Sequence, residues 1–140
     1  MSVPSYRRTE NKFEVLNIAM EVFNLTLSLV KNEQVIPKKN FKFIAEPMLN
    51  NIRNIMYKLS IANNVYVRSE EQINYRKRLQ NEIKELIIMF MVDIQIAISL
   101  TQNTDNLLKF EKLLSKTEDL KIKLKSWSNY TKKLKQSNCP

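Results

Sequence analysis

Apolar residues recur along most of this chain at steps of three and four, which is the spacing of one face of an α-helix. Stretches rich in polar residues interrupt the pattern, and they predict four helices, at about residues 12–31, 44–64, 70–101 and 104–133. Because the connections between these helices are short, we expect neighbours to run antiparallel. The predicted fold is all-α, an up-down-up-down four-helix bundle over residues 12–135. Residues 1–11 are expected to form a flexible arm and residues 136–140 a tail.

The same spacing indicates which side chains face the core in the first, second and fourth helices. In each of them the apolar positions form one stripe along the helix. The residues expected to face the core are Phe13, Leu16, Met20, Phe23, Leu27 and Val30 in the first helix, Met48, Ile52, Ile55, Leu59 and Ala62 in the second, and Phe110, Leu113, Thr117, Leu120, Leu124, Trp127 and Leu134 in the fourth.

The third expected helix is apolar on more than one side. Its core stripe comprises Leu79, Ile83, Leu86, Phe90, Ile94 and Ala97. The apolar residues outside this stripe are Ile87, Ile88, Met91, Val92 and Ile98. The apolar run over residues 86–100 is shorter than the roughly 20 residues that a bilayer crossing requires, and it contains Asp93 and Gln95. We therefore do not expect a membrane span or a membrane partner.

The apolar residues outside the core stripe predict that copies of the chain associate. A helix that still shows apolar surface after packing into its own bundle needs a second partner. Asp93, the one acid in the apolar run, is expected to pair with Lys or Arg across an interface rather than to act as a general base. The residues expected to form the interface of a homo-oligomer are Ile87, Met91, Ile98 and Trp127.

Residues near the expected helix ends fit known capping patterns. Asn32 marks the end of the first helix, because asparagine tolerates the left-handed conformation that closes helices. Pro47 marks the start of the second helix, because a proline in the first turn sacrifices no intrahelical hydrogen bond. Ser69 and Gln72 are expected to form a capping box ahead of the third helix, and Thr104 to cap the fourth.

The composition removes most of the residue types that catalysis and metal binding use. The 140 residues include no glycine, no histidine and a single cysteine, Cys139. The usual glycine-containing hairpins and phosphate-binding loops are therefore not expected, and neither are a catalytic triad, a zinc site or an internal disulfide. We expect a protein without enzymatic activity, cofactor or metal. Residues 1–11 are polar and do not resemble a signal peptide, so a cytoplasmic location is expected.

The positive charge of the chain is concentrated in its last helix. The formal net charge is +9, of which the stretch from Lys109 to the end contributes +6. Such an excess favours polyanions such as nucleic acid, and lysines contact phosphates better than bases, so binding should be sensitive to salt. A solvated lysine face, an acidic protein partner and an anionic membrane surface are alternatives. The candidate nucleic-acid-binding residues are Lys38, Lys39, Arg76, Lys77, Arg78, Lys112, Lys116, Lys121, Lys123, Lys125, Lys132 and Lys133.

Several short motifs together resemble a known family. The first helix is followed by the sequence Ile-Pro-Lys-Lys at residues 36–39 and by Phe43, and then by a second helix and a long aliphatic third helix. This order resembles the bacterial four-helix-bundle proteins that include Avd, the accessory variability determinant of diversity-generating retroelements, over residues 12–130. Related bundle proteins are encoded in intervening sequences of large-subunit ribosomal RNA genes. The fourth helix contributes the series Phe110, Leu113, Leu120, Leu124 and Trp127.

The resemblance implies a homopentameric barrel that binds a reverse transcriptase and its template RNA, or an RNA/DNA hybrid, and that supports error-prone cDNA synthesis without catalysing it. The family often has arginines in its third helix, where this chain has Met91, Asp93 and Gln95, and a glycine pair before its tryptophan, where this chain has Lys125 and Ser126. RNA contacts are therefore expected from the fourth helix and the loop lysines. The alternative is a structural, protein-binding bundle of the ribosomal RNA intervening-sequence type with no nucleic-acid role.

Overall fold

The computed structural model describes the backbone of residues 3–138 and the side chains of residues 14–134. This part of the chain is helical and contains no strand, which confirms the predicted all-α class. Two short turns, η1 (Lys38–Asn40) and η2 (Phe41–Ala45), lie between the first two long helices. The four long helices are α1 (Val3–Lys31), α2 (Glu46–Asn63), α3 (Glu70–Ser99) and α4 (Thr104–Asn138).

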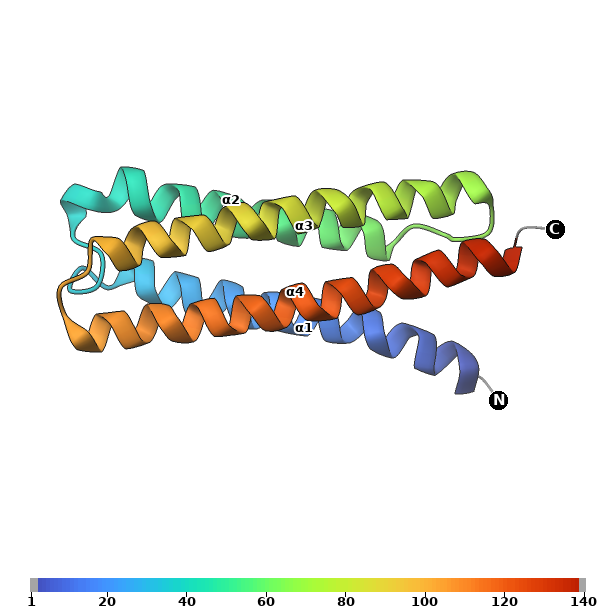
Figure 1. Cartoon of the computed structure of the whole chain (residues 1–140), viewed down its shortest axis with the longest axis horizontal. Coiled ribbons are helices and arrows are strands. Elements are labelled where there is room, and N and C mark those ends of the chain that lie inside the picture. The colour runs from blue at the N-terminus through green and yellow to red at the C-terminus, as the bar shows by residue number, and fades with distance from the viewer. Residues whose placement is uncertain (1–2, 139–140) are drawn as a thin grey trace.

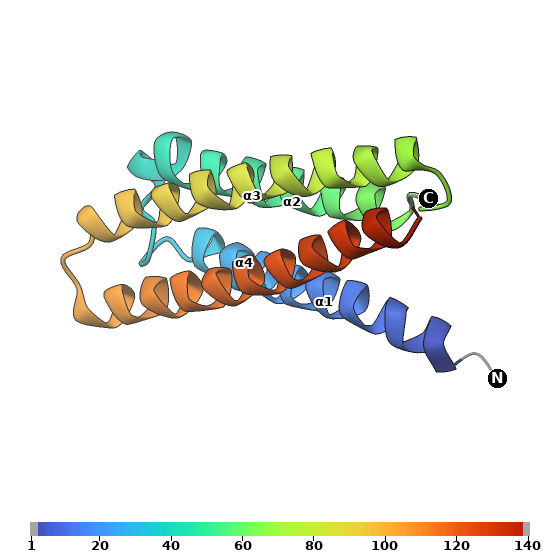
Figure 2. The same ribbon diagram turned by 45° about the vertical axis from the view of Figure 1, so that its right-hand side comes forward.

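Consecutive helices run antiparallel, as in an up-down-up-down four-helix bundle (Figure 1). α1 and α3 each pack against both α2 and α4, so α1 and α3 lie diagonally opposite each other in the bundle. The α1–α2 and α3–α4 connections lie together at one end of the bundle, which we call the connection end (Figure 2). The α2–α3 connection lies at the opposite end, beside both chain termini, which we call the terminal end.

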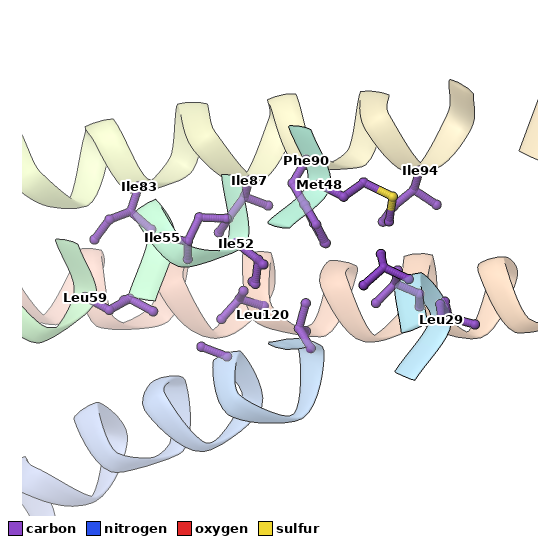
Figure 3. Close-up of a cluster of buried hydrophobic side chains, with 14 of the residues drawn as sticks. Leu29, Met48, Ile52, Ile55, Leu59, Ile83, Ile87, Phe90, Ile94 and Leu120 are labelled. Carbon is purple, nitrogen blue, oxygen red and sulfur yellow. The ribbon is translucent and has the colours of Figure 1, made fainter. Parts of the chain in front are cut away.

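The core runs along the axis of the bundle and receives apolar side chains from all four helices (Figure 3). The predicted core face is confirmed for α2 and, except for the half-buried Leu134, for α4. Burying a side chain of this kind contributes roughly 1.5–3 kcal/mol relative to leaving it in water. The confirmed core residues are Met48, Ile52, Ile55, Leu59 and Ala62 of α2 and Phe110, Leu113, Thr117, Leu120, Leu124 and Trp127 of α4.

The predicted core face of α1 was only partly right, because Leu16, Phe23 and Leu27 pack against the edge of the core and not at its centre. Of the expected residues with a described side chain, Val30 is buried, whereas Met20 is exposed and three others are half-buried. α1 is apolar on two adjacent sides, and the side with the smaller residues, including Ala19 and Thr26, faces the core because it allows the neighbouring helices to approach. The Thr26 hydroxyl donates to the Val22 carbonyl at 2.7 Å, which satisfies it inside the core. The residues of α1 that pack into the bundle are Val15, Ala19, Val22, Thr26, Leu29 and Val30.

The helices at both chain ends are longer than expected. α1 begins at Val3, so most of the expected arm over residues 1–11 is helical, and α4 continues to Asn138 through most of the expected tail. Pro4 lies in the first turn of α1, where a missing N–H costs no intrahelical bond, and no glycine or proline interrupts the chain from there to the end of the helix. Residues 1–2 and 139–140, and with them Cys139, lie outside the described residues.

Two of the expected helix signals at α2 and α3 are present. Pro47 lies in the first turn of α2, as predicted. Ser69 Oγ accepts a hydrogen bond from the Gln72 N–H at 3.2 Å, which confirms Ser69 as the N-cap of α3. The return bond of the capping box differs, because Gln72 Oε1 accepts from the N–H of Arg68 at 3.0 Å instead of from Ser69.

Of the other two helix-end predictions, the position of Asn32 directly after the end of α1 is confirmed, but its left-handed conformation and the Thr104 cap were wrong. No residue over 3–138 has positive φ, and Asn32 acts through its side chain, whose Oδ1 accepts from the Gln34 N–H at 2.9 Å. At the start of α4 the cap is Asn103 and not Thr104. Asn103 Oδ1 accepts from the N–H groups of Asp105 and Asn106 at 2.8 and 3.2 Å, which places the cap one residue earlier than expected.

Candidate nucleic-acid interface

Two of the four residues expected at a subunit interface are buried inside their own bundle. Ile87 is 0% exposed and Trp127 is 1% exposed, so neither side chain reaches the surface of the molecule. Figure 3 shows Ile87 pointing into the core. The prediction for Ile87 was wrong because Ile87, and not the half-buried Leu86, continues the core stripe of α3. The prediction for Trp127 was wrong because this residue belongs to the buried side of α4, with Leu120 and Leu124. The other two expected interface residues, Met91 and Ile98, are half-buried.

α3 nevertheless carries an exposed row of apolar side chains. Four of its members follow one another at steps of four residues, which places them on the same side of the helix. Apolar residues in such a contiguous row mark a surface that a partner covers more often than isolated exposed ones do. We call this row the α3 stripe, and it consists of Ile88, Met89, Val92, Ile96 and Leu100.

Arg76, expected to contact nucleic acid, is 0% exposed, so that prediction was wrong. Its Nε donates to the Ala62 carbonyl at 3.2 Å and its Nη2 to the Val65 carbonyl at 2.8 Å, which ties the C-terminal end of α2 to α3. Its guanidinium carbon lies 5.5 Å from the centre of the Trp127 ring. Burial lowers the pKa of Arg76. Carbonyls at the end of a helix lack intrahelical partners and favour a nearby cation, which explains the inward position.

The lysines of α4 form two rows, and the row that faces α1 is paired with acids. The Lys116 ammonium lies 2.8 Å from a carboxylate oxygen of Glu21, and the Lys123 ammonium lies 3.0 Å from one of Glu14. The hydrogen bond and the charge of Glu21 raise the pKa of Lys116. Lys112 lies four residues before Lys116 and extends the same row. The acids of α1 therefore offset much of the positive charge on this side of the helix.

The second row of α4 lysines lines a groove between α3 and α4 in the half of the bundle nearer the terminal end. Lys121, Lys125 and Lys132 recur at steps of four and seven, and Lys84 enters the groove from α3. The groove has a volume of about 640 Å³, and we call it the lysine groove. Within the described part of the chain, no carboxylate forms an ion pair with any of these four lysines. Other polar residues that line the groove include Asn81, Glu118, Ser128 and Asn129.

Gln80 lies beneath the lysine groove and carries an unused hydrogen-bond acceptor. Its Nε2 donates to Thr131 Oγ1 at 3.0 Å, and the Thr131 hydroxyl donates its own proton to the Trp127 carbonyl at 3.2 Å. Because that hydroxyl has one proton, it can only accept from Gln80, which fixes the orientation of the Gln80 amide. Its Oε1 has no partner among the described residues. Because Gln80 is only 2% exposed, this acceptor belongs to the interior of the bundle and not to the groove surface.

Toward the connection end, the surface between α3 and α4 changes from basic to apolar. It is lined there by residues of the α3 stripe, together with Met91 of α3 and Leu114 of α4. Glu118 and Lys121 line both this apolar surface and the lysine groove, so the two are continuous. One surface of the molecule therefore offers a place for phosphates beside a place for an apolar partner.

The remaining predicted basic residues do not join the lysine groove. Lys38 lies 3.5 Å from a carboxylate oxygen of Glu33, and both it and Lys39 belong to the connection end, far along the bundle from the start of α3. Of the basic residues near the start of α3, Lys77 is half-buried and Arg78 is exposed. Lys133 is exposed on α4. The structure thus brings together three of the twelve predicted residues, Lys121, Lys125 and Lys132, and adds Lys84.

Asp93 bonds within its own subunit and not to a described cation. The Asn51 side-chain amide of α2 donates to Asp93 Oδ2 at 2.6 Å. Burial raises the pKa of the Asp93 carboxyl, and the hydrogen bond from Asn51 opposes that shift. This hydrogen bond links α2 to α3, and the expected pairing of Asp93 with Lys or Arg across an interface stays a prediction.

The sequence analysis missed a group of exposed tyrosines on α2, α3 and the connection between them. Tyr57, Tyr66 and Tyr75 each lie beside an arginine, and all three rings are exposed. Two of the pairs carry a signal in the sequence, because the arginine lies three or four residues from the tyrosine on the same helix. The pairs Arg53–Tyr57 and Tyr75–Arg78 could therefore have been predicted from the sequence, whereas Tyr66–Arg68 lies in the connection and has no helical spacing to indicate it.

No family model, no curated protein and no solved structure matches the chain. Among the described residues, no helix combines the length and the apolar character that a membrane crossing needs. The described His, Cys, Asp and Glu residues form no group of three or more arranged to hold a metal ion. The features that remain are surfaces for binding, namely the lysine groove, the α3 stripe and the exposed tyrosines.

Proposed function

We propose that this chain is a non-catalytic, cytoplasmic accessory protein that binds template RNA through the lysine groove and assists the reverse transcriptase of a diversity-generating retroelement. The observation that carries the proposal is the division of the α4 lysines into two rows. One row is paired with acids of α1, whereas the other lines a groove with no ion-pair partner among the described residues. The link to the retroelement rests on the resemblance to Avd-like bundles.

The chemistry of the lysine groove favours the phosphate backbone of a nucleic acid over its bases. Each lysine offers a compact charge that binds a phosphate without reading sequence, so binding should be broad in sequence and sensitive to salt.

We also propose that the α3 stripe is the contact between copies of the chain in a homo-oligomer, with a homopentamer as the expected form. The stripe lies toward the connection end and the lysine groove toward the terminal end, so an assembly through the stripe leaves the groove open. Burying these apolar side chains would stabilise the assembly by roughly 25 cal/mol for each Å² removed from water.

The proposal predicts that RNA affinity depends on one row of lysines and not on the other. A variant with Lys121→Gln, Lys125→Gln and Lys132→Gln should bind a labelled structured RNA more weakly, with a salt slope smaller by about two. The matched control is Lys116→Gln with Lys123→Gln, which changes the same helix but removes lysines already paired with acids. Fluorescence anisotropy at several salt concentrations measures both. Equal losses in the two variants, or RNA binding by wild type that ignores salt, would contradict the proposal.

A second candidate function is that of a structural bundle that binds only protein, as in the ribosomal RNA intervening-sequence relatives named above. The α3 stripe favours this function, because an exposed apolar surface binds protein and not the phosphates of a nucleic acid. In that case wild-type protein should oligomerise normally and bind no RNA near physiological salt. The same titration therefore separates the two functions.

A further inference from the structure

Three exposed tyrosine rings near the terminal end of the bundle are each covered on one side by an arginine. Tyr57 on α2, Tyr66 in the α2–α3 connection and Tyr75 on α3 are 55%, 68% and 39% exposed. The guanidinium carbons of Arg53, Arg68 and Arg78 lie 6.0, 4.9 and 5.3 Å from the respective ring centres. We call these six residues the Tyr–Arg surface.

The arginines hold these rings ready for a planar partner. A guanidinium over an aromatic ring is attracted to it electrostatically, and it limits the orientations of both side chains before any ligand binds. In the described part of the chain, none of the three arginines forms an ion pair with a carboxylate, although Arg53 also donates to the Tyr57 hydroxyl at 3.0 Å. Arg78 lies near enough to Glu82 to help lower the pKa of that carboxyl, so the charges of Arg53 and Arg68 are the more available to a ligand.

The rings border a shallow groove between α2 and α3. Tyr66 and Tyr75 line it together with Ile61 and Asn64 of α2, and Tyr57 lies one helical turn before Ile61. The lysine groove runs along the other side of α3, also toward the terminal end. α3 therefore has aromatic rings on its α2 side and unpaired lysines on its α4 side within the same half of the bundle.

We propose that the Tyr–Arg surface stacks with unpaired bases of single-stranded RNA whose phosphate backbone runs into the lysine groove. This inference rests on the proposed function and adds that the preferred ligand is a single strand. Base-paired RNA hides its base faces within the helix, whereas unpaired bases stack on exposed aromatic and guanidinium planes. Glu70 and Glu71 border the surface at the start of α3, which disfavours an acidic peptide there but not an uncharged base.

The test compares an unpaired and a fully paired RNA of equal length. A variant with Tyr57→Leu, Tyr66→Leu and Tyr75→Leu should lose at least about tenfold in affinity for a single-stranded oligoribonucleotide, because each base stack is worth a factor of that order. Its affinity for a blunt-ended RNA duplex of the same length should stay within about threefold of wild type. Replacing the same tyrosines with phenylalanine keeps the rings and should retain single-strand binding. Circular dichroism checks that each variant remains helical.

A fluorescent base analogue locates the contact. 2-Aminopurine within the single strand should change its emission when wild type binds it, and should do so much less with the leucine variant. If the leucine variant binds both RNAs as wild type does, the surface takes no part in RNA binding and the inference falls, while the lysine result still stands. If the leucine variant keeps its RNA affinity but loses a protein contact or its oligomeric size, the surface is a protein interface and the inference is equally overturned. If wild type binds neither RNA, the proposed function itself fails.

Discussion

Arg76 shows how a charged side chain can serve the fold from inside the core. It has no carboxylate partner among the described residues; its Nε and Nη2 donate to the carbonyls of Ala62 in α2 and Val65 in the connection, and its guanidinium lies near the Trp127 ring, while its Nη1 has no partner among the described residues. Removing water from a guanidinium is unfavourable, and it is tolerated only where hydrogen bonds replace the water. Arg76 thereby links α2, α3 and α4 at the terminal end, beneath both proposed RNA contacts.

Asp93 gives a pH dependence whose sign follows from its surroundings. Burial raises the pKa of this carboxyl in the folded protein, so the folded state holds its proton at a pH where the unfolded state has lost it. The protonated Asp93 carboxyl therefore contributes to the free energy of unfolding at low pH. This contribution should fall as the pH rises from the unfolded-state pKa through the raised folded-state pKa, and it is absent at neutral pH.

Asp93→Asn removes this charge while keeping an acceptor for the Asn51 amide. We expect a melting temperature at neutral pH equal to or above that of wild type, and a smaller rise in stability on acidification. Thermal unfolding followed by circular dichroism between pH 4 and 7 measures both quantities. Asp119→Asn, at an exposed position, is the control for the loss of one carboxylate. A clear loss of stability in Asp93→Asn at neutral pH would show that the carboxylate form is required.

At the scale of single elements, the start of α4 depends on one side chain. Asn103 Oδ1 accepts from two N–H groups of the first turn, which otherwise lack intrahelical partners. Asn103→Ala should lower the free energy of unfolding by about 1 kcal/mol. Thr104→Ala is the matched control, and its effect should be smaller because Thr104 is not the cap. Urea denaturation measures both, and equal effects would mean that the cap is shared.

The predictability of each helix depended on how many apolar sides it has. α2 and α4 each have one, so the spacing identified their core residues. α1 has two adjacent apolar sides, and the choice between them was made by the small residues Ala19 and Thr26, which the spacing does not weigh. α3 is apolar on more than one side over residues 86–99, which is why Ile87 was assigned to the surface although it is buried.

The candidate site was predictable only as an excess of charge. The lysines of α4 are evident in the sequence, but the division into two rows depends on Glu14 and Glu21 of α1, which lie about a hundred residues earlier and meet α4 only in the folded chain. Lys84 joins the groove through the packing of α3 against α4. Helical spacing within one element does not contain that information.

At the scale of the whole molecule, the α3 stripe predicts association. Val92 is 53% exposed in the middle of the stripe, so Val92→Glu should weaken contacts between copies while leaving the bundle folded. We expect light scattering to give a mass several times 16.6 kDa for wild type and a lower one for the variant. Leu108→Glu, at an exposed apolar position of α4 outside the stripe, is the control and should retain the wild-type mass.

Ile87→Glu places the same charge in the core of the bundle and not on its surface. Because Ile87 is enclosed in the core, a carboxylate there would be buried without a partner, and we expect loss of helicity as well as of association. A monomeric wild type in dilute buffer would contradict the role given to the α3 stripe. An unchanged mass for Val92→Glu beside an oligomeric wild type would place the contact elsewhere.

The apolar surface between α3 and α4 is continuous with the lysine groove at Lys121 and Glu118, so the proposed assembly and the proposed RNA binding would be coupled thermodynamically. If copies meet at the α3 stripe, the edge of each groove lies beside a neighbouring molecule, and a strand long enough to cross that edge binds two copies at once. Affinity for long RNA should then increase with protein concentration, and RNA should in turn promote assembly by the same factor, because such coupling is reciprocal. Short oligonucleotides confined to one groove should show no such cooperativity.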